Sequence, residues 1–225
     1  MLEKIAVNLM AGVPAVVKPS EYTCYLTEVM VRDIIASGIL PEGSLQLVCG
    51  LGRGIIDHVD MEDTVTFTGS AHTGKVLKGL PHITERSVAF NLEADSLNAS
   101  ILGEKATPDT EEFALFVKEV TKEITVKAGQ KCTAVRRIIV PENMLEDVQA
   151  AISKRLSTTM IGDPSQEGVR MGALATRTQV DRVRENVELL AKSQEMVFGD
   201  LDNFEVVGAD KDKGAFFSPI LFRNS

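Results

Sequence analysis

Residues 127–141 read KAGQKCTAVRRIIVP, a stretch that joins the end of one predicted helix to the start of one predicted strand. A helical apolar period covers residues 109–127, and Gly129 stands where a glycine commonly ends a helix. β-Branched residues then fill 134–140, so Cys132 falls in the turn between helix and strand, where a side chain can reach a cleft. A helix followed closely by a strand is typical of α/β proteins.

The same alternation of strands and helices runs along the rest of the chain. Strands are predicted at residues 14–18, 44–49, 64–69, 87–93, 96–102 and 134–140. Helices are predicted at residues 2–11, 22–37, 71–78, 109–127, 142–158 and 176–194. In TPDTEEF, Thr107 is the expected helix cap and Pro108 fits the first helical position. The pattern favours parallel α/β sheets, with a domain change in the polar stretch at 94–108.

Composition excludes several classes of partner. The 225 residues have a net charge of -8 and a pI near 5.0, and their basic residues are scattered, so we expect no nucleic acid and no membrane surface as partner. No apolar run is long enough to span a bilayer and no signal peptide is evident, which predicts a cytoplasmic protein. Cys24, Cys49 and Cys132 are too widely spaced for a disulfide framework or a metal site, so we expect reduced thiols and no metal.

Cys132 has two interpretations. A cysteine without context is most often a small buried hydrophobe, and Cys24 and Cys49 are interpreted as core residues in that way. Cys132 lies in a turn, which favours a reactive thiol. It follows the negative end of a helix, so the helix dipole does not activate it; activation has to come from Lys131, from a cationic cofactor or from a nearby base.

Three other segments carry candidate residues, each with a plainer alternative. VVKPSE (16–21) places Lys18 after a strand, where a lysine is usually a surface residue. VTFTGSAHTGK (65–75) forms a strand-to-helix turn that could meet a phosphate, although isolated glycine turns are usually structural. NLEADSLN (91–98) places Glu93 at a strand end, where a solvated carboxylate is the plain interpretation.

Two more features are interpreted as structural. Asp95, just after Glu93, is either a supporting partner of that carboxylate or a turn residue, and the turn is favoured. GLGRG (50–54) lacks the third glycine of a dinucleotide-binding fingerprint and is predicted to be a loop.

Taken together, these motifs resemble those of the aldehyde dehydrogenase family. GQKCTA is similar to the family's GQxC motif, with Cys132 as nucleophile, and NLEADSLN stands where the family has ELGG, with Glu93 as general base. FTGSAHTG is similar to the FTGSxxxG turn, which implies cofactor contacts from Gly69, Ser70 and Gly74, and VVKPSE is similar to the KPSE motif, which implies contacts from Lys18, Ser20 and Glu21. The motifs stand in the family's order, and Cys132 follows Glu93 by 39 residues, about the family's spacing.

The resemblance implies an α/β fold of aldehyde dehydrogenase type. Residues 1–94 would form the later part of a Rossmann-type NAD(P)-binding domain, and residues 95–225 an incomplete catalytic domain that carries the thiol. Within the family, EADS in place of ELGG and the residues after GQKC resemble the dehydrogenase half of a bifunctional phenylacetate-degradation protein, which oxidises a CoA-thioester semialdehyde. That branch resembles NADP users, whereas a carboxylate such as Glu21 suits the free 2′-hydroxyl of NAD, so both cofactors remain open.

The implied reaction is the oxidation of a small-molecule aldehyde to an acid. Cys132 would form a thiohemiacetal and then a thioester, which water activated by Glu93 would hydrolyse; this role calls for a carboxylate whose pKa is raised by a partly apolar site. A CoA-acylating dehydrogenase is an alternative, against which Glu93 argues because that reaction needs no activated water. A catalytically inactive binding or assembly module is the other, against which retention of Cys132 and Glu93 argues.

Family members are more than twice as long as this chain. The resemblance places an FNxP-like motif, whose asparagine completes the oxyanion hole, before residue 1, and an ExFGP motif after residue 225. We therefore expect the 225-residue chain by itself to bind cofactor poorly and to turn over little or nothing, and we expect a homo-oligomer in a full-length parent.

Overall fold

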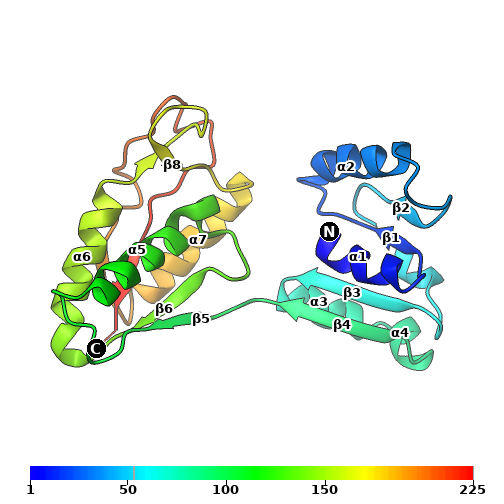
Figure 1. Cartoon of the computed structure of the whole chain (residues 1–225), viewed down its shortest axis with the longest axis horizontal. Helices are drawn as coiled ribbons and strands as arrows, with labels where there is room; N and C mark the ends of the chain where they lie inside the picture. The colour runs from blue at the N-terminus through cyan, green and yellow to red at the C-terminus, as the bar shows by residue number, and fades with distance from the viewer. Residues whose placement is uncertain (53, 225) are drawn as a thin grey trace. The chain divides into compact units, whose positions relative to one another are not determined.

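The computed structural model describes residues 1–52 and 54–224, and it divides the chain into two compact units. The first unit is Met1–Asp95 and the second is Ser96–Ser225 (Figure 1). The division falls within one residue of the domain change that the sequence places after residue 94. Each unit has its own strands and its own apolar core.

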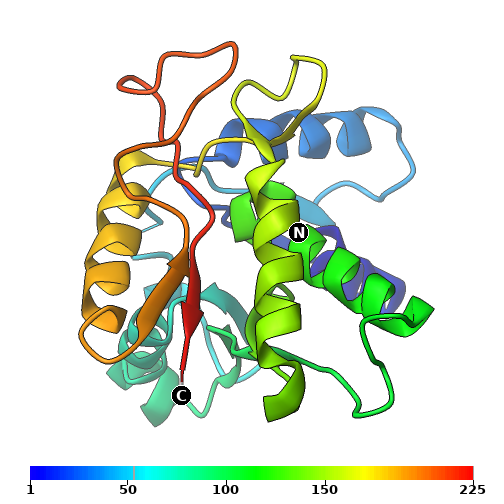
Figure 2. The same ribbon diagram turned by 90° about the vertical axis from the view of Figure 1, so that its left-hand side faces the viewer.

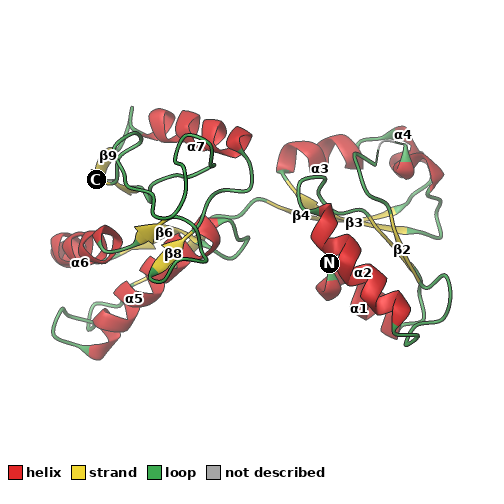
Figure 3. Ribbon diagram, turned by 90° about the horizontal axis from the view of Figure 1, so that it is seen from above, coloured by secondary structure: helices red, strands yellow, loops and turns green. Residues whose placement is uncertain are grey.

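The first unit contains two parallel strand pairs and their helices. Strand β1 (Ala15–Val17) pairs with β2 (Leu45–Leu47), and β3 (Thr64–Gly69) pairs with β4 (Ala89–Ala94). The helices are α1 (Leu2–Met10), α2 (Cys24–Ala36), α3 (Ala71–Lys78), α4 (Pro81–Glu85) and the 3₁₀ turn η1 (Ile55–His58). Helix α3 packs on β3 and β4, and Figure 3 shows α1 and α3 on opposite sides of these strands. Helices on both sides of parallel strands are the arrangement expected of an α/β unit.

The core of the first unit joins its N-terminal elements. Ile5 of α1, Ala15 of β1, Val31 of α2 and Leu45 of β2 form one buried apolar cluster. In both short strands the first residue is buried and the second is exposed, as the two-residue period of a strand requires. This burial holds β1 in place, and with it the residues that follow its carboxyl end.

The second unit is built from three further strand pairs. Strand β5 (Asn98–Ile101) pairs in parallel with β6 (Val135–Ile139), β7 (Met160–Ile161) in parallel with β8 (Val169–Met171), and β9 (Glu195–Phe198) antiparallel with β10 (Leu221–Arg223). The helices are α5 (Glu111–Thr125), α6 (Leu145–Ser157), α7 (Arg177–Leu190) and the 3₁₀ turns η2 (Val126–Gly129) and η3 (Glu142–Met144). Gly162 and Val207 form an additional bridge.

Two apolar clusters stabilise the second unit, one on each side of β10. The larger contains α5 and α6 residues spaced three or four apart: Phe113, Val117, Val120, Val148, Ile152 and Leu156. The smaller contains Leu174, Val187 of α7 and Phe217. Leu221 packs on the larger cluster and its neighbour Phe222 on the smaller, because successive strand residues face opposite sides. Figure 2 shows β9 and β10 side by side, with α6 and α7 to either side of them.

Two sequence predictions are corrected by the structure, and four strands are additional to those predicted. Helix α5 begins at Glu111 with Thr110 as its cap, because the Thr107 hydroxyl donates to the Asp109 carboxylate and residues 107–110 form a separate turn. Strands β7 to β10 were not predicted from the sequence. Cys49 is exposed and is not a core residue, since it lies beyond the end of β2.

Residues 1–52 and 54–224 contain neither a membrane-spanning helix nor a cluster of metal ligands. No helix there is both long and apolar enough to cross a membrane. No group of three or more His, Cys, Asp or Glu side chains there is placed to hold a metal ion.

Candidate active site

Cys132 lies at the end of a strained turn in the second unit. Helix α5 ends at Thr125, and Lys127, Ala128 and Gly129 then adopt left-handed backbone with φ of 53°, 51° and 69°. Glycine tolerates this conformation, whereas lysine and alanine adopt it at a cost in free energy. Residues 127–133 are called the cysteine turn below; its thiol is exposed to solvent.

Side chains on both sides hold the cysteine turn in this conformation. The Gln130 amide donates to the Lys127 carbonyl (3.0 Å) and accepts from the backbone N–H of Ala175 (2.9 Å). The Arg136 guanidinium, from β6, donates to the Gly129 carbonyl (2.7 Å). These bonds supply partners for carbonyls that the helix end leaves without intrahelical ones, and they stabilise a backbone that would otherwise relax.

Asn98, the first residue of β5, binds the other end of the cysteine turn. Its side-chain amide donates to the carbonyl of Cys132 (2.6 Å) and to that of Ala134 (3.3 Å). Ala134 is completely buried, so this end of the turn is anchored in the interior of the second unit.

The Lys131 ammonium is paired with a carboxylate rather than free to activate the thiol. It donates to both carboxylate oxygens of Glu123 on α5, each at 2.7 Å, and both side chains are largely buried. A lysine whose charge is neutralised by a carboxylate gives a neighbouring thiolate little electrostatic stabilisation. Of the three sources of activation considered from the sequence, the structure thus disfavours Lys131.

Glu93 lies near the end of β4, opposite Thr68 of β3 in the parallel register. Its carboxylate forms an ion pair with the ammonium of Lys4 on α1, and the two side chains are 53% and 33% exposed. The described residues of the first unit therefore give Glu93 a charged, half-exposed environment rather than the partly apolar one expected for a general base. Cys132, by contrast, belongs to the second unit.

The glycine-rich turn after β3 leads directly into α3. Ser70 is the N-cap, and its hydroxyl accepts from the Thr73 N–H (3.2 Å). Gly74 is buried, and a Cβ added there would lie 2.4 Å from Leu92 of β4, so its lack of a side chain is explained by packing. The Asp95 carboxylate accepts from the Ala71 N–H at 3.3 and 3.4 Å, which joins the end of β4 to the start of α3.

Gly69 precedes this turn as the last residue of β3. Its backbone is ordinary extended strand, and an added Cβ would lie 2.5 Å from the ring of Phe67, so a side chain there would displace the phenylalanine. Gly69 and Ser70 are both exposed, as a residue that contacts a ligand must be.

Lys18 and Glu21 follow the carboxyl end of β1. The Lys18 ammonium donates to the Gly50 carbonyl (3.0 Å) and lies 3.9 Å from the Glu21 carboxylate. A side chain at Gly52 would collide with the Lys18 stem, 2.3 Å away, so this glycine allows the loop at 50–52 to approach the lysine. Ser20 and Glu21 are exposed; Arg53, within the GLGRG segment predicted as a loop, lies outside the described residues.

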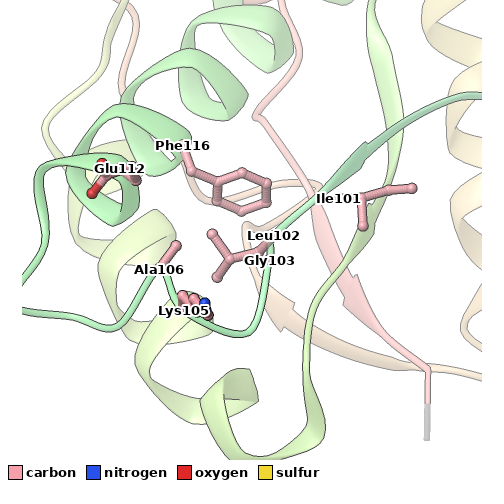
Figure 4. A pocket seen from close by; sticks show the side chains of 7 residues that line it. All are labelled: Ile101, Leu102, Gly103, Lys105, Ala106, Glu112 and Phe116. Carbon is pink, nitrogen blue, oxygen red and sulfur yellow. The ribbon is translucent and has the colours of Figure 1, made fainter.

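An open hollow of about 450 Å³ in the second unit is not part of the candidate site. It is lined by Ile101, Leu102, Gly103, Lys105, Ala106, Glu112 and Phe116 (Figure 4). These residues lie at or after the carboxyl end of β5, whereas Cys132 precedes the amino end of β6. Because β5 and β6 are parallel, the hollow and the cysteine turn lie at opposite ends of the strand pair.

The sequence alone does not predict Lys4, Asn98 or Glu123 as partners of the candidate residues. Lys4 and Glu93 are 89 residues apart, and Asn98 and Cys132 are 34 apart. No local pattern reports such contacts. The available signal for Asn98 is its place within the strand predicted at 96–102; that this strand pairs with the one that follows Cys132 is seen in the structure.

Comparison with known proteins identifies the family. The family model described as "Aldehyde dehydrogenase family" matches residues 1–225, and the chain therefore belongs to the aldehyde dehydrogenase family. It is 45% identical over 219 residues to a 3,4-dehydroadipyl-CoA semialdehyde dehydrogenase of Aromatoleum evansii, a match that covers 97% of this chain and 42% of that protein. It is 28% identical over 228 residues to a 1-pyrroline-5-carboxylate dehydrogenase of Oceanobacillus iheyensis, which covers 96% and 41%.

Solved structures agree with the expected α/β aldehyde dehydrogenase fold. Betaine aldehyde dehydrogenase of Staphylococcus aureus in complex with NAD+ matches with a TM-score of 0.83 and 25% identity over 97% of this chain and 42% of that one. Aldehyde dehydrogenase C of Pseudomonas syringae, a mutant in complex with NAD+ and octanal, matches with a TM-score of 0.81 and 26% identity, over 97% and 44%. The chain thus spans less than half the length of these relatives.

Proposed function

We propose that the polypeptide carrying this chain oxidises an aldehyde to a carboxylic acid, with NAD or NADP as cofactor and Cys132 as nucleophile. The observation that carries this proposal is the cysteine turn, in which an exposed thiol follows three left-handed residues held by side-chain hydrogen bonds. Strained backbone that is fixed from several sides is commonly found at catalytic groups. Family membership supplies the reaction class.

Cys132 and Glu93 act in succession in the proposed reaction. The Cys132 thiolate attacks the carbonyl carbon, so that a C–S bond forms and the carbonyl oxygen becomes an oxyanion. A bound nicotinamide would supply the acceptor for the hydride that leaves this carbon, which would turn the Cys132 adduct into a thioester. Glu93 then takes a proton from water, which attacks the thioester carbon; the C–S bond breaks, and the acid and the free thiolate are released.

The residues of the first unit fit a dinucleotide. Lys18 and Glu21 follow a parallel strand at its carboxyl end, the usual position of nucleotide-binding side chains in α/β proteins. The exposed Glu21 carboxylate can accept hydrogen bonds from ribose hydroxyls, and the Lys18 ammonium beside it offers a positive charge. Ser70 and Gly69 place an exposed hydroxyl and exposed backbone at the start of α3. This set is compatible with NAD and, through Lys18, with NADP.

The proposed substrate is a semialdehyde joined to coenzyme A through a thioester, formed when an aromatic ring has been opened. The relative from Aromatoleum evansii, named for such a compound, supports this choice, as does EADS in place of ELGG. The proposed working form is a homo-oligomer, as expected from the family resemblance.

The test uses the full natural polypeptide that contains these residues, a CoA-linked semialdehyde, and NAD+ or NADP+ in turn. We expect a free carboxylic acid as product. Cys132→Ser should abolish turnover, and Glu93→Gln should slow steady-state turnover about 10²- to 10⁴-fold while a single burst of reduced cofactor remains. A product that is an acyl-CoA formed from added CoA would instead identify a CoA-acylating dehydrogenase, and full activity of Cys132→Ser would contradict the proposal.

A further inference from the structure

Asn98 extends the β5–β6 hydrogen-bond ladder into the cysteine turn by means of its side chain. In the register of the two strands Asn98 lies opposite Val135, where the pairing is irregular. The carbonyls of Cys132 and Ala134 both precede β6. The Asn98 amide donates to both, at 2.6 Å and 3.3 Å, so one side chain ties two carbonyls of the segment before β6 to the start of β5.

Asn98 is itself held in position by β6. The Arg137 guanidinium donates to the carbonyl of Leu97, the residue before Asn98, through two nitrogens at 2.7 Å and 3.2 Å. This forked contact fixes the start of β5 relative to β6. The donor that binds the Cys132 carbonyl is therefore attached to a rigid backbone.

The contact to the Cys132 carbonyl restricts the part of the residue that carries the thiol. Holding this carbonyl fixes rotation about the bond between Cα and the carbonyl carbon, while the sulfur remains exposed and free to react. On the other side of Cys132, the left-handed residues Lys127 and Ala128 favour relaxation of the turn. The Asn98 amide opposes that relaxation.

We propose that Asn98 is a positioning residue for the nucleophile: its amide fixes the Cys132 peptide so that the thiol meets the substrate carbonyl at the correct distance and angle. The proposal rests on the proposed function of Cys132. A displacement of reacting atoms by about 1 Å can lower a rate about 100-fold, so the loss of this contact should reduce kcat without removing the thiol.

The test compares Asn98→Ala and Asn98→Asp with wild type in the full natural polypeptide. Asn98→Asp has nearly the same shape but places carboxylate oxygens against two carbonyl oxygens. Asn91→Asp is the matched control, because Asn91 is an exposed asparagine on β4. Three quantities are measured for each protein: kcat and KM with the aldehyde, the rate at which iodoacetamide alkylates Cys132, and Tm.

We expect both Asn98 variants to lose about 10- to 100-fold in kcat, with KM changed less than threefold and Cys132 alkylated within threefold of the wild-type rate. As pH falls, the kcat of Asn98→Asp should rise part of the way towards that of wild type measured at the same pH, because a protonated carboxyl can again donate a hydrogen bond. Asn91→Asp should match wild type in all three quantities.

Two results would overturn the inference in distinguishable ways. If Cys132→Ser is inactive but the folded Asn98 variants keep wild-type kcat, the positioning role is wrong and the nucleophile assignment stands. If Cys132→Ser keeps wild-type activity, both are wrong. A third result would also overturn the inference. If the fall in kcat of Asn98→Asp is accompanied by a lower Tm and by much slower alkylation of Cys132, Asn98 has a structural role only.

Discussion

Gly74 shows how a single missing side chain sets the separation between a helix and a strand. An added Cβ would lie 2.4 Å from one methyl carbon of Leu92 and 3.0 Å from the other, closer than packed atoms approach. Gly74→Ala should therefore destabilise the first unit by about 1–3 kcal/mol, although alanine is the better helix former. Urea denaturation of the purified chain measures this change.

A matched pair of variants separates packing from other roles of Gly74. Shortening the neighbour with Leu92→Ala should make the Gly74→Ala substitution much less costly, since the colliding atoms are gone. Gly103→Ala, where an added Cβ meets no atom within 4 Å, should change the free energy of unfolding little. An equal cost of Gly74→Ala with and without Leu92 would contradict the packing explanation.

At the residue scale the sequence predicts candidate positions better than their partners. Cys132, Glu93 and Ser70 stand in short motifs, and such motifs are visible without a structure. The ion pair of Glu93 with Lys4 and the bond of Cys132 to Asn98 depend on how distant segments come together. Lys131 illustrates the limit: its place next to Cys132 suggested activation of the thiol, but its ammonium binds Glu123.

The start of α5 predicts a pH dependence of stability. The Thr107 hydroxyl donates to the Asp109 carboxylate at 2.6 Å, and this bond is the largest of the effects that lower the pKa of Asp109 below its ordinary value of 3.8. Because the pKa of Asp109 is lower in the folded chain, Asp109 binds more protons in the unfolded chain at pH values between its two pKa values. The contribution of the ionised Asp109 carboxylate to the stability of the folded chain is complete above the ordinary pKa. It is lost as pH falls through the lowered pKa.

Thr107→Val removes the hydroxyl donor and should lower the urea midpoint at pH 7 more than at pH 3. Thr66→Val, at an exposed position of β3, is the control, and its effect should not depend on pH in this way. A Thr107→Val effect of the same size at both pH values would show that the carboxylate is not its partner in solution.

Elements with a clear apolar pattern over several residues, or with a strong helix cap, could be predicted from the sequence. The predicted helix at 71–78 is α3, and the predicted strand at 64–69 is β3, each with the predicted bounds. Strands β7 to β10 have two to four residues each, which is too short for a two-residue period to be recognised in the sequence. The start of α5 was placed too early because Thr107 and Thr110 are both plausible caps, and only the folded chain shows that Thr110 accepts from Phe113.

At the scale of the whole molecule, the chain spans less than half of its relatives, and the strands of residues 1–52 and 54–224 form five two-stranded pairs. Two-stranded pairs leave unpaired edges, and the first unit exposes large apolar side chains such as Tyr25, Leu26 and Val29 of α2. We therefore expect the purified 225-residue chain to produce no steady-state reduced cofactor with an aldehyde and either nicotinamide cofactor. Absorbance at the wavelength of the reduced cofactor measures this, and sustained production that needs Cys132 would contradict it.

The structure divides into two compact units after Asp95, one residue from the boundary placed after residue 94 on the polar stretch that follows Glu93; the assignment of the two parts as a cofactor domain and a catalytic domain stays a prediction. The fold class followed from the alternation of elements and from the motifs, and solved aldehyde dehydrogenases agree with it. The placement of Glu93 in a charged, half-exposed environment could not be predicted, because Lys4 reaches it from the other end of the unit's sequence.

The most direct test of the central claim is the mass of the Cys132 peptide from the Glu93→Gln variant of the full natural polypeptide, taken after incubation with a CoA-linked semialdehyde and oxidised cofactor. The claim predicts that this peptide gains the acyl group of the oxidised aldehyde as a thioester, which hydroxylamine removes. An unmodified Cys132 in a variant that has reduced its cofactor would show that the aldehyde is oxidised without this thiol, and would contradict the claim.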